Sequence, residues 1–251
     1  MDALRNFLSH KTASPLTVFA SGESNNRHAL TAMGRDDESL TIIELFQSQG
    51  CSSCPPTETN LHTLLPQNPN LLLLTYDVTY WDHLGWTDTF GNKLWDHRQR
   101  AYSSKWGRKS VFTPQVVVDG VADGVGNGKN EVLEIVARAK RERLGLGMRV
   151  EIFVEGRELM IGGEAGEAGM YDVLLVVFDP REQSVEIKRG ENRGRTLAHW
   201  NLVKEIRKIG EWRGGNARVG LPESLEDGLE RVVILQSGVG GAISAAHRFE
   251  E

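Results

Sequence analysis

Apolar runs alternate with a helical pattern in the first part of the chain. Leu40–Phe46 and Asn70–Val78 are short, apolar and rich in strand-forming residues, which is typical of buried strands. Between them, Thr57–Leu65 has leucines on one helical face. Because proline is tolerated only in the first helical turn, the Pro55–Pro56 pair predicts a helix start at about residues 51–52. Strand, helix and strand in this order predict a parallel crossover unit.

The pattern then changes to an aromatic-rich stretch, Thr79–Lys109, in which helical spacing predicts an inserted helix. After it, Val116–Val118 and Val121–Val125 flank Asp119–Gly120, a pair that favours a hairpin turn. Asn127–Leu144 is amphipathic and predicts a helix that ends at the glycines following it. The region up to residue 146 therefore looks like an α/β domain.

From Met148 onward, short apolar runs separated by glycine-rich turns predict strands. The stretch Thr196–Trp212 fits either a helix or a long strand, and its surroundings favour the strand. The other predicted strands are Arg149–Val154, Glu158–Ile161, Tyr171–Phe178, Ser184–Lys188 and Arg231–Gln236. This pattern is typical of an antiparallel sandwich. We therefore predict an N-terminal extension (1–39), an α/β domain (40–146) with an insertion (79–109), and a β-rich, sandwich-like domain (147–251), α+β overall.

Composition and charge exclude several function classes. The 251 residues carry a net charge of -5, which argues against nucleic acid as a partner because phosphate contacts require a positive face. The longest apolar run, Val173–Phe178, is far shorter than the roughly 20 residues of a membrane-spanning helix. We expect a soluble, cytoplasmic protein of undetermined oligomeric state. The mitochondrion is the alternative, because Ala3–Lys11 fits an amphipathic presequence helix.

Cys51 and Cys54 are the two cysteines of the chain, and their spacing is the strongest chemical signal. The positive end of a helix favours a thiolate, so we expect Cys51 to be an exposed nucleophile and Cys54 to resolve the mixed disulfide that forms on it. Two alternatives stay open. The pair contributes to a zinc site completed by histidines such as His62, His83 or His97, or both thiols are buried and structural. We expect no cofactor and no metal.

These features resemble a thioredoxin-like domain over Leu40–Arg143. More closely, the chain resembles an uncharacterised thioredoxin-like family labelled as domain of unknown function 1223, from about Leu40 to the C-terminus. The segments that carry this resemblance are Ile43–Phe46, Ser48–Pro56, Tyr80–Trp86, Arg98–Tyr102, Thr113–Gly120 and Arg189–Leu197. The resemblance implies the fold more than the function.

By this resemblance, Thr113–Pro114 is a cis peptide that lies beside Cys51, with Thr113 against the substrate backbone and Pro114 part of the catalytic site. Glu44 resembles the buried acid that helps to deprotonate the resolving cysteine, and a glutamate facing solvent is the alternative. The implied activity is thiol-disulfide exchange with a protein or a small thiol. The competing hypothesis is a non-catalytic binding protein on the same scaffold, with structural cysteines.

Polar and aromatic residues after the second predicted strand are candidates for substrate binding, since ligands bind at this end of open α/β sheets. They are Trp81, Asp82, His83 and Trp86. Packing of the inserted helix is the alternative for the tryptophans. Further along, Arg189–Arg195 is punctuated by glycine and predicts a turn with internal Arg–Glu pairing. The basic stretch around it, Arg181–Arg218, is interpreted as a solvated sheet face.

Overall fold

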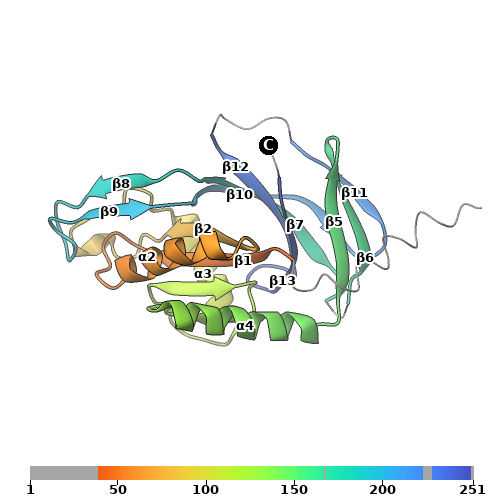
Figure 1. Ribbon diagram of the computed structural model, residues 1–251, viewed down its shortest axis with the longest axis horizontal. Coiled ribbons are helices and arrows are strands. Elements are labelled where there is room, and N and C mark those ends of the chain that lie inside the picture. Colours follow the sequence, from red (N-terminus) through yellow and green to blue (C-terminus); the bar gives the residue numbers. More distant parts are fainter. Residues whose placement is uncertain (1–38, 167, 223–227, 250–251) are drawn as a thin grey trace, which may run out of the picture. The chain divides into compact units, whose positions relative to one another are not determined.

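The computed structural model describes residues 39–166, 168–222 and 228–249. The predictions for the N-terminal extension, including its presequence helix, therefore lie outside the described residues. From Ser39 onward the chain forms one compact unit. Figure 1 shows the order of its helices and strands.

The predicted crossover unit is confirmed. Strands β1 (Thr41–Gln47) and β2 (Leu71–Asp77) pair in parallel, with Ile43 opposite Leu73, and helix α2 (Cys54–Leu64) connects them. Every residue of β1 is buried, which explains why its sequence is a continuous apolar run and not an alternating one. A short 3-10 helix, η1 (Leu65–Gln67), follows α2.

The predicted hairpin is also present. Strand β3 (Gln115–Val118) pairs antiparallel with β1 and with β4 (Ala122–Gly124). Asp119 and Gly120 have φ angles of 47° and 66°, so both occupy the left-handed region that a tight hairpin turn requires. This sequence signal is local, which is why the turn could be predicted.

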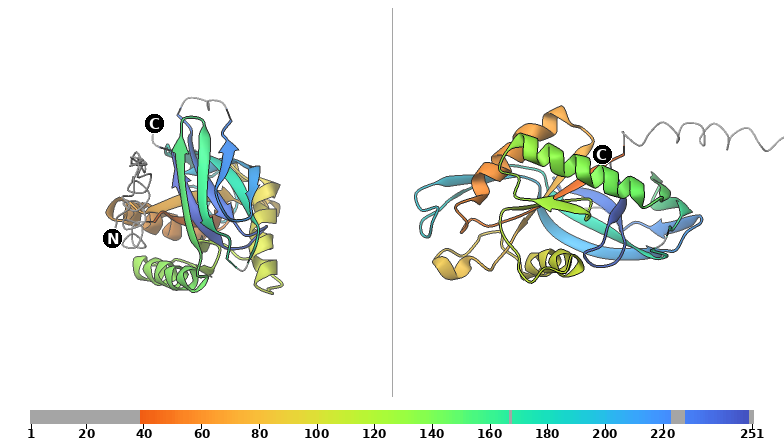
Figure 2. Two further views of the ribbon diagram at one scale, coloured as in Figure 1. Left: turned by 90° about the vertical axis from the view of Figure 1, so that its right-hand side faces the viewer. Right: turned by 90° about the horizontal axis from the view of Figure 1, so that it is seen from below.

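Helices cover both faces of the sheet, as Figure 2 shows. Helix α3 (Lys93–Lys105) is the predicted insertion, and a second 3-10 helix, η2 (Asp82–Leu84), precedes it. Trp95 and Tyr102 of α3 pack against β1 and β2 on one face. On the opposite face, α2 and α4 (Lys129–Gly145) pack against the other side chains of the same strands.

The C-terminal half is β-rich, as predicted, but its strands continue the N-terminal sheet. Its members in the large sheet are β7 (Tyr171–Asp179), β10 (Leu202–Trp212), β12 (Glu230–Gln236) and β13 (Ile243–Arg248). Strand β10 pairs in parallel with β2, through Leu202 and Thr75, and in antiparallel with β7. Among the described residues, the order of this sheet is β13-β12-β7-β10-β2-β1-β3-β4. Both halves of the chain therefore contribute to one mixed sheet. The boundary that we predict near residue 146 does not separate two independent sheets.

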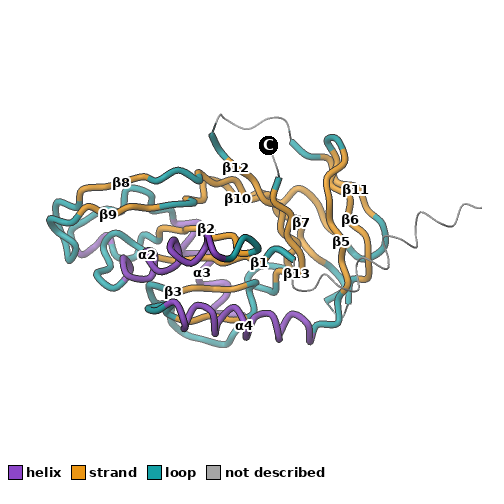
Figure 3. Tube along the Cα trace, in the orientation of Figure 1, coloured by secondary structure: helices purple, strands orange, loops and turns teal. Residues whose placement is uncertain are grey.

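A smaller sheet packs on the C-terminal strands and gives this half a sandwich-like core. It consists of β5 (Arg149–Glu155), β6 (Glu158–Glu164) and β11 (Ala217–Gly220), in the order β11-β6-β5. Leu159 and Ile161 of this sheet meet Val173 and Leu235 of the large one around the buried Trp212. Figure 3 shows the smaller sheet beside the C-terminal strands.

Strands β8 (Gln183–Glu186) and β9 (Thr196–His199) form a separate two-stranded hairpin. It projects from the C-terminal half and lies beside α2, as Figures 1 and 3 show. The segment that joins its strands is folded back on itself, because Ile187 accepts a backbone hydrogen bond from Gly194 at 2.7 Å and donates one to Arg195 at 2.9 Å. This ordered segment brings residues of the second half of the chain to the cysteine pair.

Replacing Gly120 with alanine should lower the free energy of unfolding by about 1–3 kcal/mol. Gly120 has a positive φ, and a Cβ there would lie 2.3 Å from the carbonyl oxygen of Gly241, which is backbone and cannot rotate away. Gly128→Ala is the matched control, because a Cβ at Gly128 meets no atom within 4 Å. Urea unfolding of the two variants measures the difference. Equal stabilities would contradict this packing.

Candidate functional site

The cysteine pair lies where β1 leads into α2. The helix begins at Cys54, with Pro55 and Pro56 in its first turn, and Ser53 is the N-cap. The predicted start at about residues 51–52 is therefore too early. Cys51 lies in the turn before the helix, where its N–H donates to the carbonyl of Ser48 at 3.0 Å and its carbonyl accepts from the N–H of Cys54 at 3.3 Å.

The sulfur of Cys51 is surrounded by hydrogen-bonding groups. Its Sγ lies 3.2 Å from Ser53 Oγ and 3.6 Å from the carbonyl oxygen of Thr113. The hydrogen bond from the Cys54 thiol is the largest of the effects that lower the pKa of Cys51 to about 6, and it outweighs the opposite effect of burial. Hydrogen bonds from the side chains of Ser53 and Thr113 act in the same direction. At neutral pH this sulfur is therefore mainly a thiolate.

Cys54 has the opposite character. Burial, followed by its hydrogen bond to Cys51 and the charge there, raises the pKa of the Cys54 thiol well above its ordinary value. The two thiols therefore differ in acidity, and Cys51 is the more acidic of the pair. The roles of nucleophile and resolving cysteine that the sequence predicts stay predictions. Both cysteines are free thiols in the structure.

The expected exposure of Cys51 is wrong. Residues 51 and 54 are each 2% exposed. The side-chain amide of Asn192, on the segment between β8 and β9, donates to the carbonyl of Cys51 at 3.0 Å and to that of Gln49 at 2.9 Å. These contacts come from a part of the chain 141 residues away, so no local pattern around the cysteines could show them.

Three residues that the sequence predicts beside Cys51, namely Thr113, Pro114 and Trp81, lie near it in the structure. The Thr113–Pro114 peptide is cis, and Pro114 is buried at the start of β3. The indole N–H of Trp81 donates to Thr113 Oγ1 at 2.7 Å, and a Cβ at Gly50 would lie 3.1 Å from Trp81 Cβ. Trp81, Thr113 and Pro114 therefore form one side of the site.

The other predicted binding residues lie in residues 79–92, here called the aromatic loop, and they do not contact the cysteines directly. Trp86 donates from Nε1 to Gln49 Oε1 at 2.9 Å, and so supports the loop that leads to Cys51. Asp82 accepts a hydrogen bond from the N–H of Asp88 at 3.1 Å, a contact within its own loop. His83 is exposed, and its Nδ1 lies 2.9 Å from the carbonyl oxygen of Tyr80. No described contact joins Asp82 or His83 to either sulfur.

Glu44 is buried, as the resemblance implies, but it lies on the wrong face of the sheet for the implied role. Its side chain lies on the same face of β1 as those of Ile42 and Phe46, toward α3. There it accepts a 2.5 Å hydrogen bond from Arg98 Nε and a second from the hydroxyl of Tyr102. Because α2 packs on the opposite face, Glu44 does not contact the cysteines.

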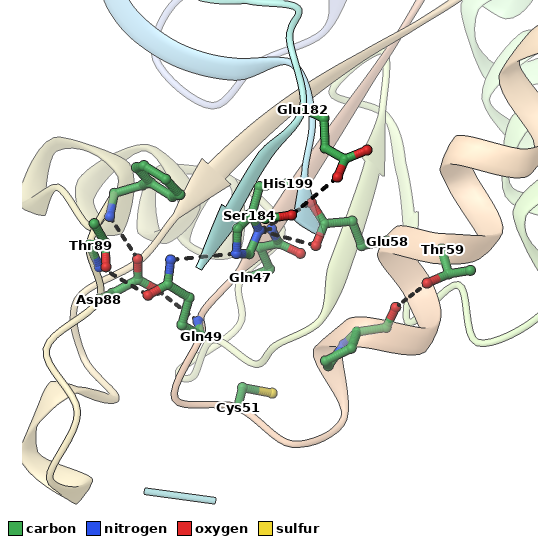
Figure 4. Close-up of polar contacts among 12 residues, drawn as sticks. Gln47, Gln49, Cys51, Glu58, Thr59, Asp88, Thr89, Glu182, Ser184 and His199 are labelled. Carbon is green, nitrogen blue, oxygen red and sulfur yellow. Dashed lines mark hydrogen bonds and ion pairs between the residues drawn. The ribbon is translucent and has the colours of Figure 1, made fainter. Parts of the chain in front are cut away.

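A buried polar network behind the cysteine loop was not predicted. His199 of β9 lies within 3.0 Å of Gln47 Nε2 and 3.1 Å of a carboxylate oxygen of Glu58 on α2. Its Nε2 is 3.4 Å from the amide of Gln49, whose backbone N–H donates to Asp88 at 2.7 Å. Figure 4 shows His199 between Gln47 and Glu58, with Cys51 on the adjacent loop. The network joins the hairpin to the start of the loop and to α2.

The surroundings of His199 raise its pKa. Burial alone would lower its pKa, but the hydrogen bond to Glu58 and the charges of Asp77 and Asp88 raise the pKa to about 9. The raised pKa of His199 therefore arises from the carboxyl groups that are buried with it. No sequence signal identifies this pair, because Glu58 and His199 are 141 residues apart and belong to no motif.

The segment between β8 and β9 contacts the cysteine turn a second time. Glu191 accepts hydrogen bonds from the hydroxyl and the backbone N–H of Ser52, at 2.8 and 3.2 Å. The predicted pairing of arginine with glutamate inside this turn is therefore wrong for Glu191. Arg195 instead donates to Asn192 Oδ1 at 2.8 Å, which orients the amide that holds Cys51.

The rate of Cys51 alkylation should be half-maximal near pH 6, which follows from the lowered pKa of this thiol. Below that pH the sulfur is protonated and the rate falls; above it the rate is constant, whereas a free thiol titrates near about pH 8.5. Iodoacetamide labelling followed by peptide mass analysis measures the profile. Cys54→Ala should move the midpoint upward because the hydrogen bond is lost. A wild-type midpoint near that of a free thiol would contradict the assigned geometry.

Two further properties concern the described residues alone. They contain no group of three or more His, Cys, Asp or Glu side chains arranged to hold a metal ion. His62, one of the histidines required by the zinc alternative, stacks on Trp200 with ring centroids 3.9 Å apart. None of the helices in this part of the chain combines the length and the apolar character needed to cross a membrane.

Comparison with known proteins places the chain in a family. A search of curated proteins found no match. A crystal structure of a protein from Agrobacterium tumefaciens is 33% identical, with a TM-score of 0.68, and the match covers 84% of this chain and 95% of that one. HBP35 of Porphyromonas gingivalis is 10% identical, with a TM-score of 0.53 and coverages of 84% and 75%, which is a likeness of fold alone. The family model described as protein of unknown function (DUF1223) matches residues 42–236, and the chain therefore belongs to this family.

Proposed function

We propose that this protein is a thioredoxin-like thiol-disulfide oxidoreductase that uses Cys51 as its nucleophile. The observation that carries the proposal is the split between the two sulfurs. The pKa of Cys51 is lowered to about 6, and that of Cys54 is raised. A thiolate is the reactive form in disulfide exchange. The second thiol stays protonated until a mixed disulfide has formed on the first, and it then attacks that disulfide.

The reaction follows from these states. The Cys51 thiolate attacks one sulfur of a disulfide, forms a mixed disulfide and releases the other half of the substrate as a thiolate. Cys54 then gives its proton to the released thiolate and attacks the Cys51 sulfur, which releases the second half as a thiolate that takes a proton from water. The protein dithiol is oxidised to a disulfide, and the substrate disulfide is reduced to two thiols. The same steps in reverse oxidise a dithiol.

The surroundings of the pair support this assignment. The motif follows β1 of a parallel crossover unit, and the cis Thr113–Pro114 peptide lies beside Cys51. This arrangement resembles the site of thioredoxin-like proteins. Trp81 donates a hydrogen bond to Thr113, and Trp86 donates one to Gln49 on the loop before Cys51. A protein or a small-molecule thiol or disulfide is the proposed partner, and the cytoplasm the proposed compartment.

A specific observation favours a second candidate, a non-catalytic binding protein with structural cysteines. Residues 51 and 54 are both 2% exposed. For the enzyme, access to Cys51 then requires a partner to displace covering contacts. Those contacts involve surface groups, since Ser52, Ser53 and Glu191 are exposed.

Reaction with an uncharged disulfide distinguishes the two candidates. The reduced, folded protein is mixed with dithiodipyridine, and the released thiopyridone is followed by absorbance. The oxidoreductase should release both halves of the reagent and end as a protein with a Cys51–Cys54 disulfide, identified by peptide mass. Structural cysteines should release neither half until the protein is unfolded, and that result would contradict the proposed function.

A further inference from the structure

The segment between β8 and β9 carries positive charge beside the cysteine pair. Lys188, Arg189 and Arg193 are exposed, and no described residue forms an ion pair with them. The acidic side chain within the segment, Glu191, is bound to Ser52 and not to a neighbouring arginine. This concentration of unpaired cations contrasts with the net charge of -5 of the whole chain.

The position of these cations is determined by contacts to the cysteine loop. Asn192, between Arg189 and Arg193 in sequence, donates to the carbonyls of Gln49 and Cys51. Gly190 packs against the aromatic loop, since a Cβ there would lie 3.4 Å from Trp86 Cβ. The backbone that bears the arginines is therefore attached to the turn that contains the nucleophile.

The turn itself already binds a carboxylate. The N–H and the hydroxyl of Ser52, the residue after the nucleophile, both donate to Glu191 Oε2. Arginine pairs well with carboxylates because its planar guanidinium donates in a fork. The exposed arginines and the two hydrogen-bond donors of Ser52 are both suited to binding carboxylates. Together they favour a substrate with negative charge near its disulfide.

We propose that the β8–β9 segment is the substrate-recognition element of the site, and that it selects disulfides flanked by carboxylates. This inference rests on the proposed function. It also assigns a role to the second half of the chain, which delivers Lys188, Arg189 and Arg193 to a nucleophile held in the first half. The arginines attract the carboxylates that flank the substrate disulfide and so increase the rate at which the substrate meets Cys51.

The test compares an anionic with an uncharged disulfide on the same thiol. Rate constants with dithiobis(nitrobenzoate), whose two halves each carry a carboxylate, and with dithiodipyridine are measured by stopped flow. The protein variants are wild type, Arg189→Gln/Arg193→Gln, and the matched control Arg141→Gln/Arg149→Gln, which removes the same charge from exposed positions on α4 and β5. Each rate constant is divided by that of free cysteine with the same reagent.

The Arg189/Arg193 variant should react about tenfold more slowly with the anionic disulfide and within about twofold of wild type with the uncharged one. The control variant should match wild type with both reagents, within about twofold. As a measurement that needs no variant, raising the ionic strength from about 0.02 M to about 0.5 M should slow the wild-type reaction with the anionic reagent alone.

The outcomes separate the two proposals. If wild type and the Arg189/Arg193 variant show the same preference between the reagents, or salt affects both reagents equally, the recognition role is refuted while the thiol chemistry stands. If Cys51 of the folded protein reacts with neither reagent, the proposed function fails and the recognition role fails with it.

Discussion

The Cys51→Ser variant should have no disulfide-exchange activity above the uncatalysed background. A serine hydroxyl is not ionised at neutral pH and cannot form the mixed disulfide, whereas the Cys51 thiol has its pKa lowered to about 6. The reduction of a protein disulfide such as that of insulin, followed by turbidity, measures the loss.

The companion variant should separate the two chemical steps. Cys54→Ser retains the nucleophile but cannot resolve its product, so it should accumulate a mixed disulfide on Cys51 that peptide mass analysis detects. Because serine replaces the hydrogen-bond donor at position 54, the alkylation midpoint should rise less than in Cys54→Ala. Equal activity of Cys51→Ser and wild type would contradict the assigned roles. So would a mixed disulfide that accumulates on Cys54 of Cys51→Ser while none forms on Cys51 of Cys54→Ser.

Removal of the His199 side chain should lower the free energy of unfolding by about 3–5 kcal/mol at neutral pH. His199→Leu leaves the buried carboxylate of Glu58 without its ionic partner and detaches Gln47 from the hairpin. Urea unfolding measures the loss. His83→Leu is the control, because His83 is exposed and its replacement should change stability by less than about 0.5 kcal/mol.

The contribution of His199 should depend on pH in a defined direction. The pKa in the folded protein is about 9, above the ordinary histidine value of 6.5, so the folded state binds the proton more tightly. The resulting stabilisation, about 3 kcal/mol, is fully present below about pH 6.5 and is lost as the pH rises through about 9. The difference in stability between wild type and His199→Gln should therefore decrease over this interval. A constant difference would contradict a charged His199.

Much of the first half of the fold could be predicted because its signals are local. The apolar runs of β1 and β2, the Asp119–Gly120 turn and the amphipathic pattern of α4 each specify one element through residues close in sequence. The pairing of strands is different. Leu202 beside Thr75 joins the two halves of the chain into one sheet, and a strand pattern does not identify its partner strand.

The site shows the same division between local and distant information. Short motifs mark Cys51, Cys54 and Thr113–Pro114, so these residues could be predicted from local sequence. The face of β1 on which Glu44 lies depends on strand register, so its neighbours could not. Asn192 and His199 resemble ordinary polar residues of a turn and an edge strand. Their contacts with Cys51 and Glu58 exist only in the folded chain, and so does the burial of Cys51.

A redox titration of the Cys51–Cys54 pair tests the central claim most directly. The folded protein is equilibrated in glutathione buffers of increasing potential and quenched in acid, and the fraction of disulfide is read by mass. We predict one reversible two-electron transition between about -120 and -270 mV, the range of thioredoxin-type proteins. Thiols that remain reduced across that range, or that form a disulfide which cannot be reversed, would contradict the account.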